Sequence, residues 1–252
     1  MKKKLILSLS AVIMAACFFA SPLFAASINL FAAASLKDVL DEITDAYTKA
    51  HPHVVFIKNY GGSGALTRQI INGAPADIFI SGTPSWTEHL KAAKKIDDKS
   101  IAVFTHNEIV FVGRENKDVK TLQDLVRLKK IAIGSPRAVS AGEYAMEAIR
   151  KAGLEKQLQK KMVMTKDVRE CLMYAIRGDV DGAFVYKTDA VHHGAERIKI
   201  LFTVPQEYYP QVVYPMFLTQ RGAQKSAAAD FYTVLRSEKT KEVLRKHGFI
   251  VR

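Results

Sequence analysis

Small, uncharged residues gather at points where a predicted strand gives way to a predicted helix. Four such junctions read FAAAS/L, NYGGS/GAL, GSPRAVSA/GEY and MTKDV/REC, and Tyr186 closes a fifth strand in FVY/KTDA. A helix start presents backbone N–H groups that have no partner within the helix, and the helix dipole favours negative charge there. These junctions could therefore hold an anion without a charged side chain. The GGSG run alone is weak evidence, because it is more often a tight turn and lacks the lysine of a nucleotide-binding loop.

Other residue types with possible chemistry favour structural interpretations. His192 and His193 are adjacent rather than at metal-ligand spacing on one helix face, so a zinc site is not expected. Glu143 and Glu147 share a predicted helix face, which a solvated surface explains more simply than acid/base catalysis. Cys171 falls inside an amphipathic helical pattern and is interpreted as a buried small hydrophobe. No nucleophile, base and orienting group occur together at the junctions, so binding is favoured over catalysis.

The elements that would position these junctions alternate along the chain. Short β-branched runs and amphipathic helical runs follow one another, which is typical of α/β proteins with mostly parallel sheets. Strands are expected at 28–31, 54–60, 77–81, 108–113, 130–134, 161–164, 182–186, 199–202 and 212–219. Helices are expected at 35–50, 63–72, 83–93, 141–151, 167–177, 187–193 and, in two pieces, 223–246. Ligands of open α/β sheets bind at the carboxyl ends of strands, where the junctions lie.

Composition narrows the class of protein. Of the 252 residues, 48% are hydrophobic, which excludes disordered and collagen-like chains. Removing the three lysines of an N-terminal leader from 37 basic residues leaves 34 against 25 acidic ones, a charge of +9. A basic exported protein suggests anionic ligands. The lysines are scattered and no basic recognition motif is present, so nucleic-acid binding is not expected.

The leader itself, residues 1–25, has the pattern of a secretory signal peptide. MKKK is followed by sixteen uncharged residues, LILSLSAVIMAACFFA, and then by SPLFAA. Cleavage is expected after Ala25, which would place the protein in the periplasm or otherwise outside the cytoplasm. The alternative takes MAAC as a lipoprotein signal with Cys17 as the acylated residue, although Met14 matches its first position poorly. After cleavage at Ala25 only Cys171 remains, so no internal disulfide is expected.

The order of these junctions resembles that of the periplasmic molybdate-binding proteins, the solute-binding components of molybdate ABC transporters. The matching segments are FAAASLKDVLDEI, GGSGALTRQIINGAPADIFIS with Trp86 soon after, VSAGEYAMEAI, DVRECL and FVYKTDAV. The resemblance implies a type II periplasmic binding protein fold, in which two α/β domains joined by two crossover strands close on a ligand in the cleft. Domain one would comprise 27–106 plus 210–252, and domain two 107–209.

The resemblance also implies the ligand contacts. Ser35 and Ser63 would each offer a hydroxyl and an amide to the oxyanion. The other domain would add the backbone amides of Ala141 and Val168 and the phenol of Tyr186. The protein would then be a monomer without a cofactor or catalytic activity, and would deliver molybdate or tungstate to the membrane permease of an ABC importer. Molybdenum would be bound only as its oxyanion, through these residues.

Hydrogen-bond chemistry supports such a site for a fully ionised anion. Seven bonds to a charged acceptor, at roughly 1.5 to 3 kcal/mol each, give on the order of 10 to 20 kcal/mol before desolvation and closure costs. Molybdate, tungstate and sulfate carry no proton at neutral pH, whereas hydrogen phosphate needs an acceptor for its proton. Sulfate stays open as an alternative, because only cavity size distinguishes it from the larger oxyanions. A secreted enzyme on the same fold is a second alternative.

Two segments depart from the family pattern. SGT, residues 81–83, stands where Ser-Ala-Asp is common, which removes a carboxylate near the cleft. Ser135 and Ser140 replace an aspartate and a proline in the loop before Ala141. Losing the proline adds conformational freedom and one hydroxyl, which leaves the tightness of that half of the site open. Arg169, directly after Val168, is interpreted as a rim or structural arginine, with steering of the anion as the alternative.

Overall fold

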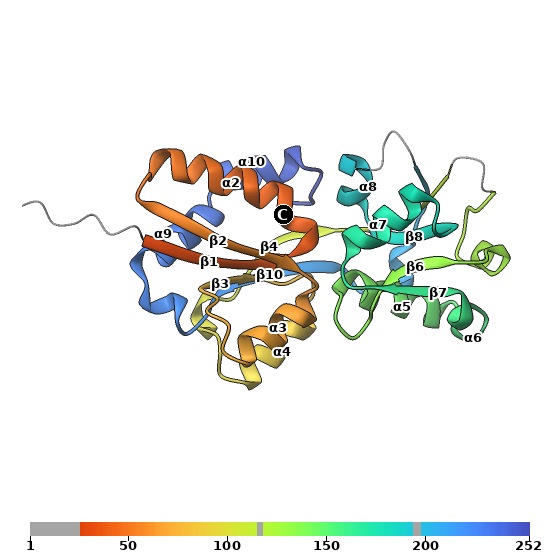
Figure 1. The fold of residues 1–252 in the computed structure, drawn as a ribbon, viewed down its shortest axis with the longest axis horizontal. Helices are drawn as coiled ribbons and strands as arrows, with labels where there is room; N and C mark the ends of the chain where they lie inside the picture. Colours follow the sequence, from red (N-terminus) through yellow and green to blue (C-terminus); the bar gives the residue numbers. More distant parts are fainter. Residues whose placement is uncertain (1–25, 115–117, 194–197) are drawn as a thin grey trace, which may run out of the picture.

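The computed structural model of the chain describes residues 26–114, 118–193 and 198–252. They form two lobes that lie side by side along the long axis of the molecule, each built on a five-stranded sheet (Figure 1). Cys17 and the expected cleavage site after Ala25 lie outside the described residues. Within the described ranges no helix is both long enough and apolar enough to cross a membrane.

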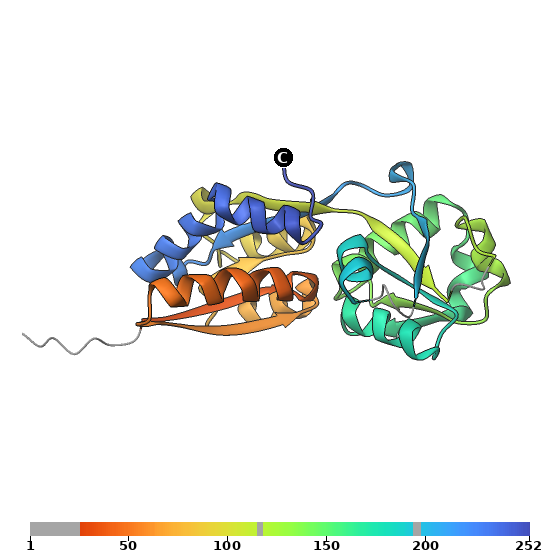
Figure 2. The same cartoon turned by 90° about the horizontal axis from the view of Figure 1, so that it is seen from above.

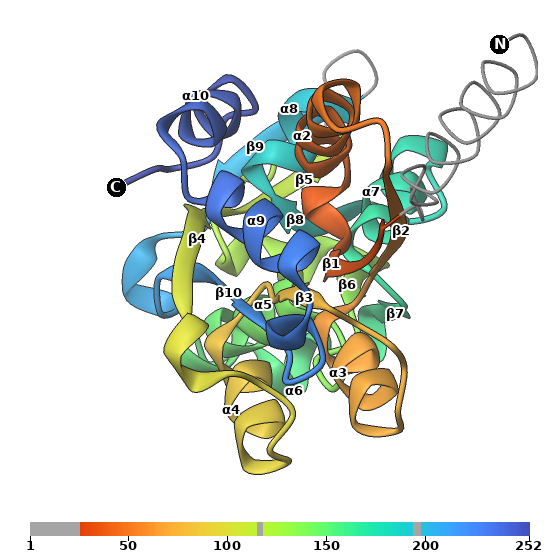
Figure 3. The ribbon, with the colours of Figure 1, turned by 90° about the vertical axis from the view of Figure 1, so that its left-hand side faces the viewer.

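The first lobe has the sheet order β2-β1-β3-β10-β4. Its strands are β1 Ala26–Ala33, β2 Val54–Gly61, β3 Ile78–Ile80, β4 Ala102–Asn107 and β10 Val212–Leu218. Its helices are α2 Lys37–Ala50, α3 Ser63–Ile71, α4 Pro84–Ala92, α9 Ser226–Leu235 and α10 Glu238–Lys246. Helices α2 and α10 cover one face of the sheet and α3 and α4 the other (Figure 3). Tyr47, Phe56 and Phe231 pack edge to face and hold α2 and α9 against β2.

The second lobe has the sheet order β7-β6-β8-β5-β9. Its strands are β5 Ile109–Gly113, β6 Ile131–Gly134, β7 Met162–Thr165, β8 Gly182–Tyr186 and β9 Lys199–Thr203. Its helices are α5 Ser140–Lys151, α6 Glu155–Leu158, α7 Val168–Arg177 and α8 Lys187–His193. Strands β5, β6 and β8 are buried along their whole length, because helices cover both faces of this sheet.

Both sheets are mixed rather than simply parallel. Strand β1 is parallel to β2 and β3, and β6 is parallel to β7 and β8, as the sequence predicts. However, β10 is antiparallel to β3 and β4, and β5 is antiparallel to β8 and β9. In each lobe the reversed strand is the one that enters from the other lobe. The two crossings therefore explain why the expectation of mostly parallel sheets holds for only half of the strand pairings.

Strand β4, residues 102–107, is absent from the sequence prediction. It precedes β5 with only Glu108 between them, so that β4 and β5 form one continuous crossing between the lobes, and the segment from β9 to β10 forms the second (Figure 2). The strand ends in Thr-His-Asn and lies at a sheet edge, so it carries little of the apolar signal of the other strands. Its edge is held by paired backbone bonds of 3.0 Å between His106 and Ile250.

Candidate functional site

The structure brings the five predicted site residues to the wall of one small pocket between the lobes. Ser35 and Ser63 line it from the first lobe, and Ala141, Val168 and Tyr186 line it from the second. The space between its lining atoms, with open solvent included, is about 210 Å³. The structure therefore brings together all five residues that the sequence analysis singled out. Their contacts with a ligand stay a prediction.

Helix starts from both lobes converge on this pocket. Ser63 is the first residue of α3, Val168 is the first residue of α7, and Ala141 is the second residue of α5. Ser35 lies in a short 3-10 turn, Ala34–Leu36, that leads into α2. The first N–H groups of a helix lack carbonyl partners within it, so these starts offer backbone donors to whatever the pocket holds.

The Ser35 hydroxyl is oriented by a tyrosine that the sequence analysis did not single out. Ser35 Oγ lies 2.9 Å from the hydroxyl of Tyr214, a fully buried residue of β10. The side-chain amide of Asn107 donates to the same Tyr214 oxygen over 3.5 Å, and within the Ser35–Tyr214 pair either hydroxyl can be the donor. Burial raises the pKa of Tyr214, so its proton is retained at neutral pH. When Tyr214 is the donor of the pair, the Ser35 proton is available to the pocket. A buried tyrosine hydroxyl requires a partner, but only the fold identifies which one.

The Ser63 hydroxyl is oriented in a similar way. The backbone N–H of Gly82 donates to Ser63 Oγ over 2.9 Å, so the Ser63 proton is free to donate elsewhere. Tyr186 ends β8 and makes a long hydrogen bond of 3.5 Å from its hydroxyl to the Gly82 carbonyl. Burial raises the pKa of Tyr186 well above its ordinary value, and Tyr186 therefore acts only as a neutral phenol at physiological pH.

Direct hydrogen bonds close the lobes around the pocket. The N–H of Gly64 donates to the carbonyl of Ala138 over 2.9 Å, and Ser85 Oγ donates to Glu143 over 3.0 Å. Burial raises the pKa of Glu143, although the Ser85 hydrogen bond opposes this effect. A Cβ atom at Gly62 would lie 2.6 Å from the Ala138 carbonyl oxygen, so glycine is needed where the two backbones meet.

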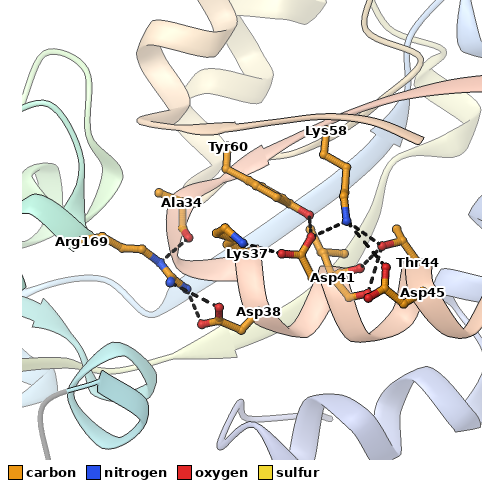
Figure 4. A network of polar contacts seen from close by, with 10 residues as sticks. Ala34, Lys37, Asp38, Asp41, Thr44, Asp45, Lys58, Tyr60 and Arg169 are labelled. Carbon is orange, nitrogen blue, oxygen red and sulfur yellow. Dashed lines mark hydrogen bonds and ion pairs between the residues drawn. The ribbon is translucent and has the colours of Figure 1, made fainter. Parts of the chain in front are cut away.

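Arg169 crosses between the lobes instead of pointing into the pocket. Its Nε donates to the carbonyl of Ala34 over 2.9 Å, and its Nη2 lies 2.6 Å from Asp38 Oδ2 (Figure 4). Both partners belong to the segment that carries Ser35. The contacts support the structural interpretation of Arg169. No lysine or arginine is among the residues that line the described pocket, so its donors are neutral.

Figure 4 also shows a cluster of hydrogen bonds around Asp41, which holds helix α2 against strand β2 on the first-lobe side of the pocket. Asp41 of α2 accepts hydrogen bonds from Lys37 at 2.5 Å, Lys58 at 2.6 Å and Tyr60 at 2.9 Å. Burial alone would raise the pKa of Asp41, but these hydrogen bonds outweigh it and lower the pKa. Because Lys58 and Tyr60 belong to β2, the cluster ties α2 to the strand that leads into the turn carrying Ser63.

The cysteine and histidine residues considered for catalysis or metal binding do not form such sites among the described residues. Cys171 is buried, and burial raises the pKa of its thiol to about 12, which confirms the interpretation as a small hydrophobe rather than a nucleophile. The ring of His192 lies 4.9 Å from that of His247. Across the described ranges no group of three or more His, Cys, Asp or Glu side chains could hold a metal ion.

Comparison with known proteins places these features in a family. The family model described as "Bacterial extracellular solute-binding protein" matches residues 28–250. YvgL of Bacillus subtilis (strain 168), whose name describes it as an ABC transporter substrate-binding lipoprotein, is 36% identical over 230 residues, covering 88% of this chain and 86% of YvgL. The molybdate-binding protein ModA of Escherichia coli (strain K12) is 30% identical over 233 residues, covering 89% of each chain.

Solved structures show the same fold. The periplasmic molybdate-binding protein of Azotobacter vinelandii superposes with a TM-score of 0.79 at 20% identity, covering 89% of this chain and 99% of that one. The sulfate-binding protein SubI of Mycobacterium tuberculosis superposes with a TM-score of 0.76 at 18% identity, covering 89% and 86%. The fold is therefore that of a type II periplasmic binding protein, and the protein binds a solute and is not an enzyme. The chain is a member of the bacterial extracellular solute-binding protein family.

Proposed function

We propose that the protein binds molybdate, and also tungstate, in the pocket between its lobes and delivers it to an ABC importer. The observation that carries the proposal is the convergence of serine hydroxyls, helix starts and a buried phenol on one pocket without a cationic side chain. Ser35, Ser63, Ala141, Val168 and Tyr186 are the proposed contacts.

The protonation states of these groups suit a dianion without a proton. The Ser63 hydroxyl already accepts from Gly82, so its proton can point into the pocket, and Tyr186 stays a neutral phenol whose proton is held only by a long bond of 3.5 Å to the Gly82 carbonyl. A dianion leaving water must find many fixed donors to replace its hydration. Hydrogen phosphate would bring a proton of its own into a site that is rich in donors, and its binding is disfavoured.

The relatives support molybdate over sulfate. A relative named as a molybdate-binding protein covers most of this chain at 30% identity, whereas the sulfate-binding neighbour shares the fold at 18%. Sulfate is the second candidate ligand, since it has the same charge and shape as molybdate and differs in size.

Delivery requires the lobes to open and close. We take residues 27–106 plus 210–252 as domain one and 107–209 as domain two, with the β4–β5 crossing and the segment before β10 as the hinge. A membrane permease of an ABC importer is the proposed partner of the monomer, as the name of YvgL suggests for that relative. The protein needs no cofactor for this role.

The exported protein has two proposed forms, one free and one anchored to the membrane. Cleavage after Ala25 would release a free protein that begins at β1. Acylation of Cys17 would tether it, and the lipoprotein name of YvgL supports this second form. Mass spectrometry of the exported protein distinguishes the two, because an acylated chain begins at Cys17. A Cys17→Ala variant that leaves the membrane fraction would establish the anchor.

Titration of the purified protein with molybdate, tungstate, sulfate and phosphate tests the proposed ligand. Trp86 is the reporter, because its ring packs so closely on Gly64 that a Cβ there would lie 2.5 Å from it, one residue from Ser63. Calorimetry and Trp86 fluorescence are expected to show tight binding of molybdate and tungstate and weak binding of the other two. Tight binding of sulfate without molybdate would replace the proposal with its second candidate.

A further inference from the structure

Ser140 carries a buried hydroxyl at the pocket wall that no group of the described residues satisfies. It is the first residue of α5, is 4% exposed and lines the pocket beside Ala141. Its Oγ has no hydrogen-bond partner among the described residues. A buried polar group without a partner costs about 1 to 3 kcal/mol, so a native structure keeps one only for a reason.

The other lobe comes close to Ser140 at the pocket wall without supplying a partner for its hydroxyl. A Cβ atom at Gly82 would lie 2.9 Å from Ser140 Cβ and 3.0 Å from its Oγ, so the other lobe approaches closely and offers no side chain there. The backbone groups of Gly82 are directed to Ser63 and Tyr186. Gly82 therefore makes room for Ser140 without serving as its partner.

The helix does not need this hydroxyl either. The residue that caps α5 is Val139, and no side chain makes a capping bond there. A serine in the first turn of a helix can be replaced by alanine with little effect on helix stability when it caps nothing. The hydroxyl is thus costly to the empty protein and brings it no structural gain.

We propose that Ser140 is a ligand-contacting residue, whose hydroxyl donates a hydrogen bond to the oxyanion in the pocket. The assignment rests on the proposed function and adds one neutral donor from the second lobe to the contacts of Ala141, Val168 and Tyr186. The role of Ser140 differs from the roles of Ser35 and Ser63 in one respect. The hydroxyl oxygens of Ser35 and Ser63 already have protein partners, whereas the Ser140 hydroxyl gains a partner only when ligand is bound.

Ser140→Ala, compared with Ser135→Ala, tests this role. Ser135 lies in the same loop but does not line the pocket, so it controls for loss of a hydroxyl nearby. Calorimetric titration with molybdate is expected to show roughly 10- to 100-fold weaker binding for Ser140→Ala and unchanged binding for Ser135→Ala. The ligand-free Tm of Ser140→Ala should equal or exceed that of the wild type, because an unsatisfied buried group is removed.

The outcomes separate this inference from the proposed function. Wild-type protein that binds none of the oxyanions would overturn both. Wild-type protein that binds molybdate while Ser140→Ala binds within twofold of it would overturn the role of Ser140 alone. A lower ligand-free Tm together with unchanged affinity would make Ser140 a structural residue.

Discussion

Arg169 Nη2 lies 2.6 Å from Asp38 Oδ2 and joins the two lobes beside the pocket (Figure 4). Arg169 directly follows Val168 at the start of α7, and Asp38 lies in the first turn of α2, three residues after Ser35. The pair therefore joins two of the helix starts that line the pocket. Such a contact would break if the lobes separated, so it stabilises their arrangement in this structure and not either lobe by itself.

Replacing Arg169 with alanine should weaken ligand binding without unfolding the protein. The variant loses a partly exposed ion pair and the hydrogen bond to Ala34, together worth about 1 to 2 kcal/mol after solvent screening. Molybdate should therefore bind roughly 5- to 30-fold more weakly, mainly through faster dissociation, which stopped-flow Trp86 fluorescence measures. Arg150→Ala, which breaks a pair within one lobe, is the control. An unchanged dissociation rate in Arg169→Ala would contradict the closure role.

Ser35→Ala and Ser63→Ala should each lose roughly 1.5 to 3 kcal/mol of binding free energy for molybdate. Each change deletes a hydroxyl that is proposed to donate to the anion and leaves the backbone amide in place. Ser27→Ala, at an exposed position of β1, is the matched control and should bind like the wild type. Calorimetry gives the affinities and circular dichroism the integrity of the fold. If both pocket variants bind like the wild type, the site is elsewhere.

Tyr214→Phe tests whether the phenol orients Ser35. The ring is fully buried and is retained in phenylalanine, so packing should change little. Without the phenol proton, the Ser35 hydroxyl can turn away from the pocket, and molybdate affinity should fall by about 3- to 10-fold. Tyr232→Phe also loses a tyrosine hydrogen bond, to the carbonyl of Ser100, and neither residue lines the pocket. It should reduce stability alone, and an equal loss of affinity in the two variants would argue against the orienting role.

The sequence predicts local elements better than it predicts partners across the fold. Strands β1, β3 and β8 and the helices that follow the junctions appear where their apolar patterns place them. Strand β4 was not predicted, because its pairing with β10 joins segments more than 100 residues apart and leaves little local pattern in the sequence. The role of Tyr214 in orienting Ser35 was not predicted for the same reason, since the two residues are 179 positions apart in the sequence. Ser140 was visible as a departure from a family pattern, but its lack of a partner is a property of the folded chain.

Asp189 is a buried carboxyl next to the interlobe contacts. Neither of its oxygens has a hydrogen-bond partner among the described residues, and Arg169 Nε lies 3.8 Å from Oδ1. Burial raises the pKa of Asp189 to about 7, against the opposing charge of Arg169, while Asp38 and Asp167 add to the increase. The folded protein thus holds a proton on Asp189 that the unfolded chain releases near pH 4.

This difference makes stability depend on pH in a defined direction. A carboxyl with a raised pKa in the folded state favours folding fully below its unfolded pKa, and this contribution is lost as pH rises towards about 7. Asp189→Asn mimics the protonated form and should be more stable than the wild type at pH 8, by on the order of 4 kcal/mol, with the difference vanishing near pH 4. Urea unfolding of both proteins between pH 4 and pH 8 measures this, with the exposed Asp179→Asn as control. A difference that stays constant over that range would mean that Asp189 is ionised in the folded protein throughout.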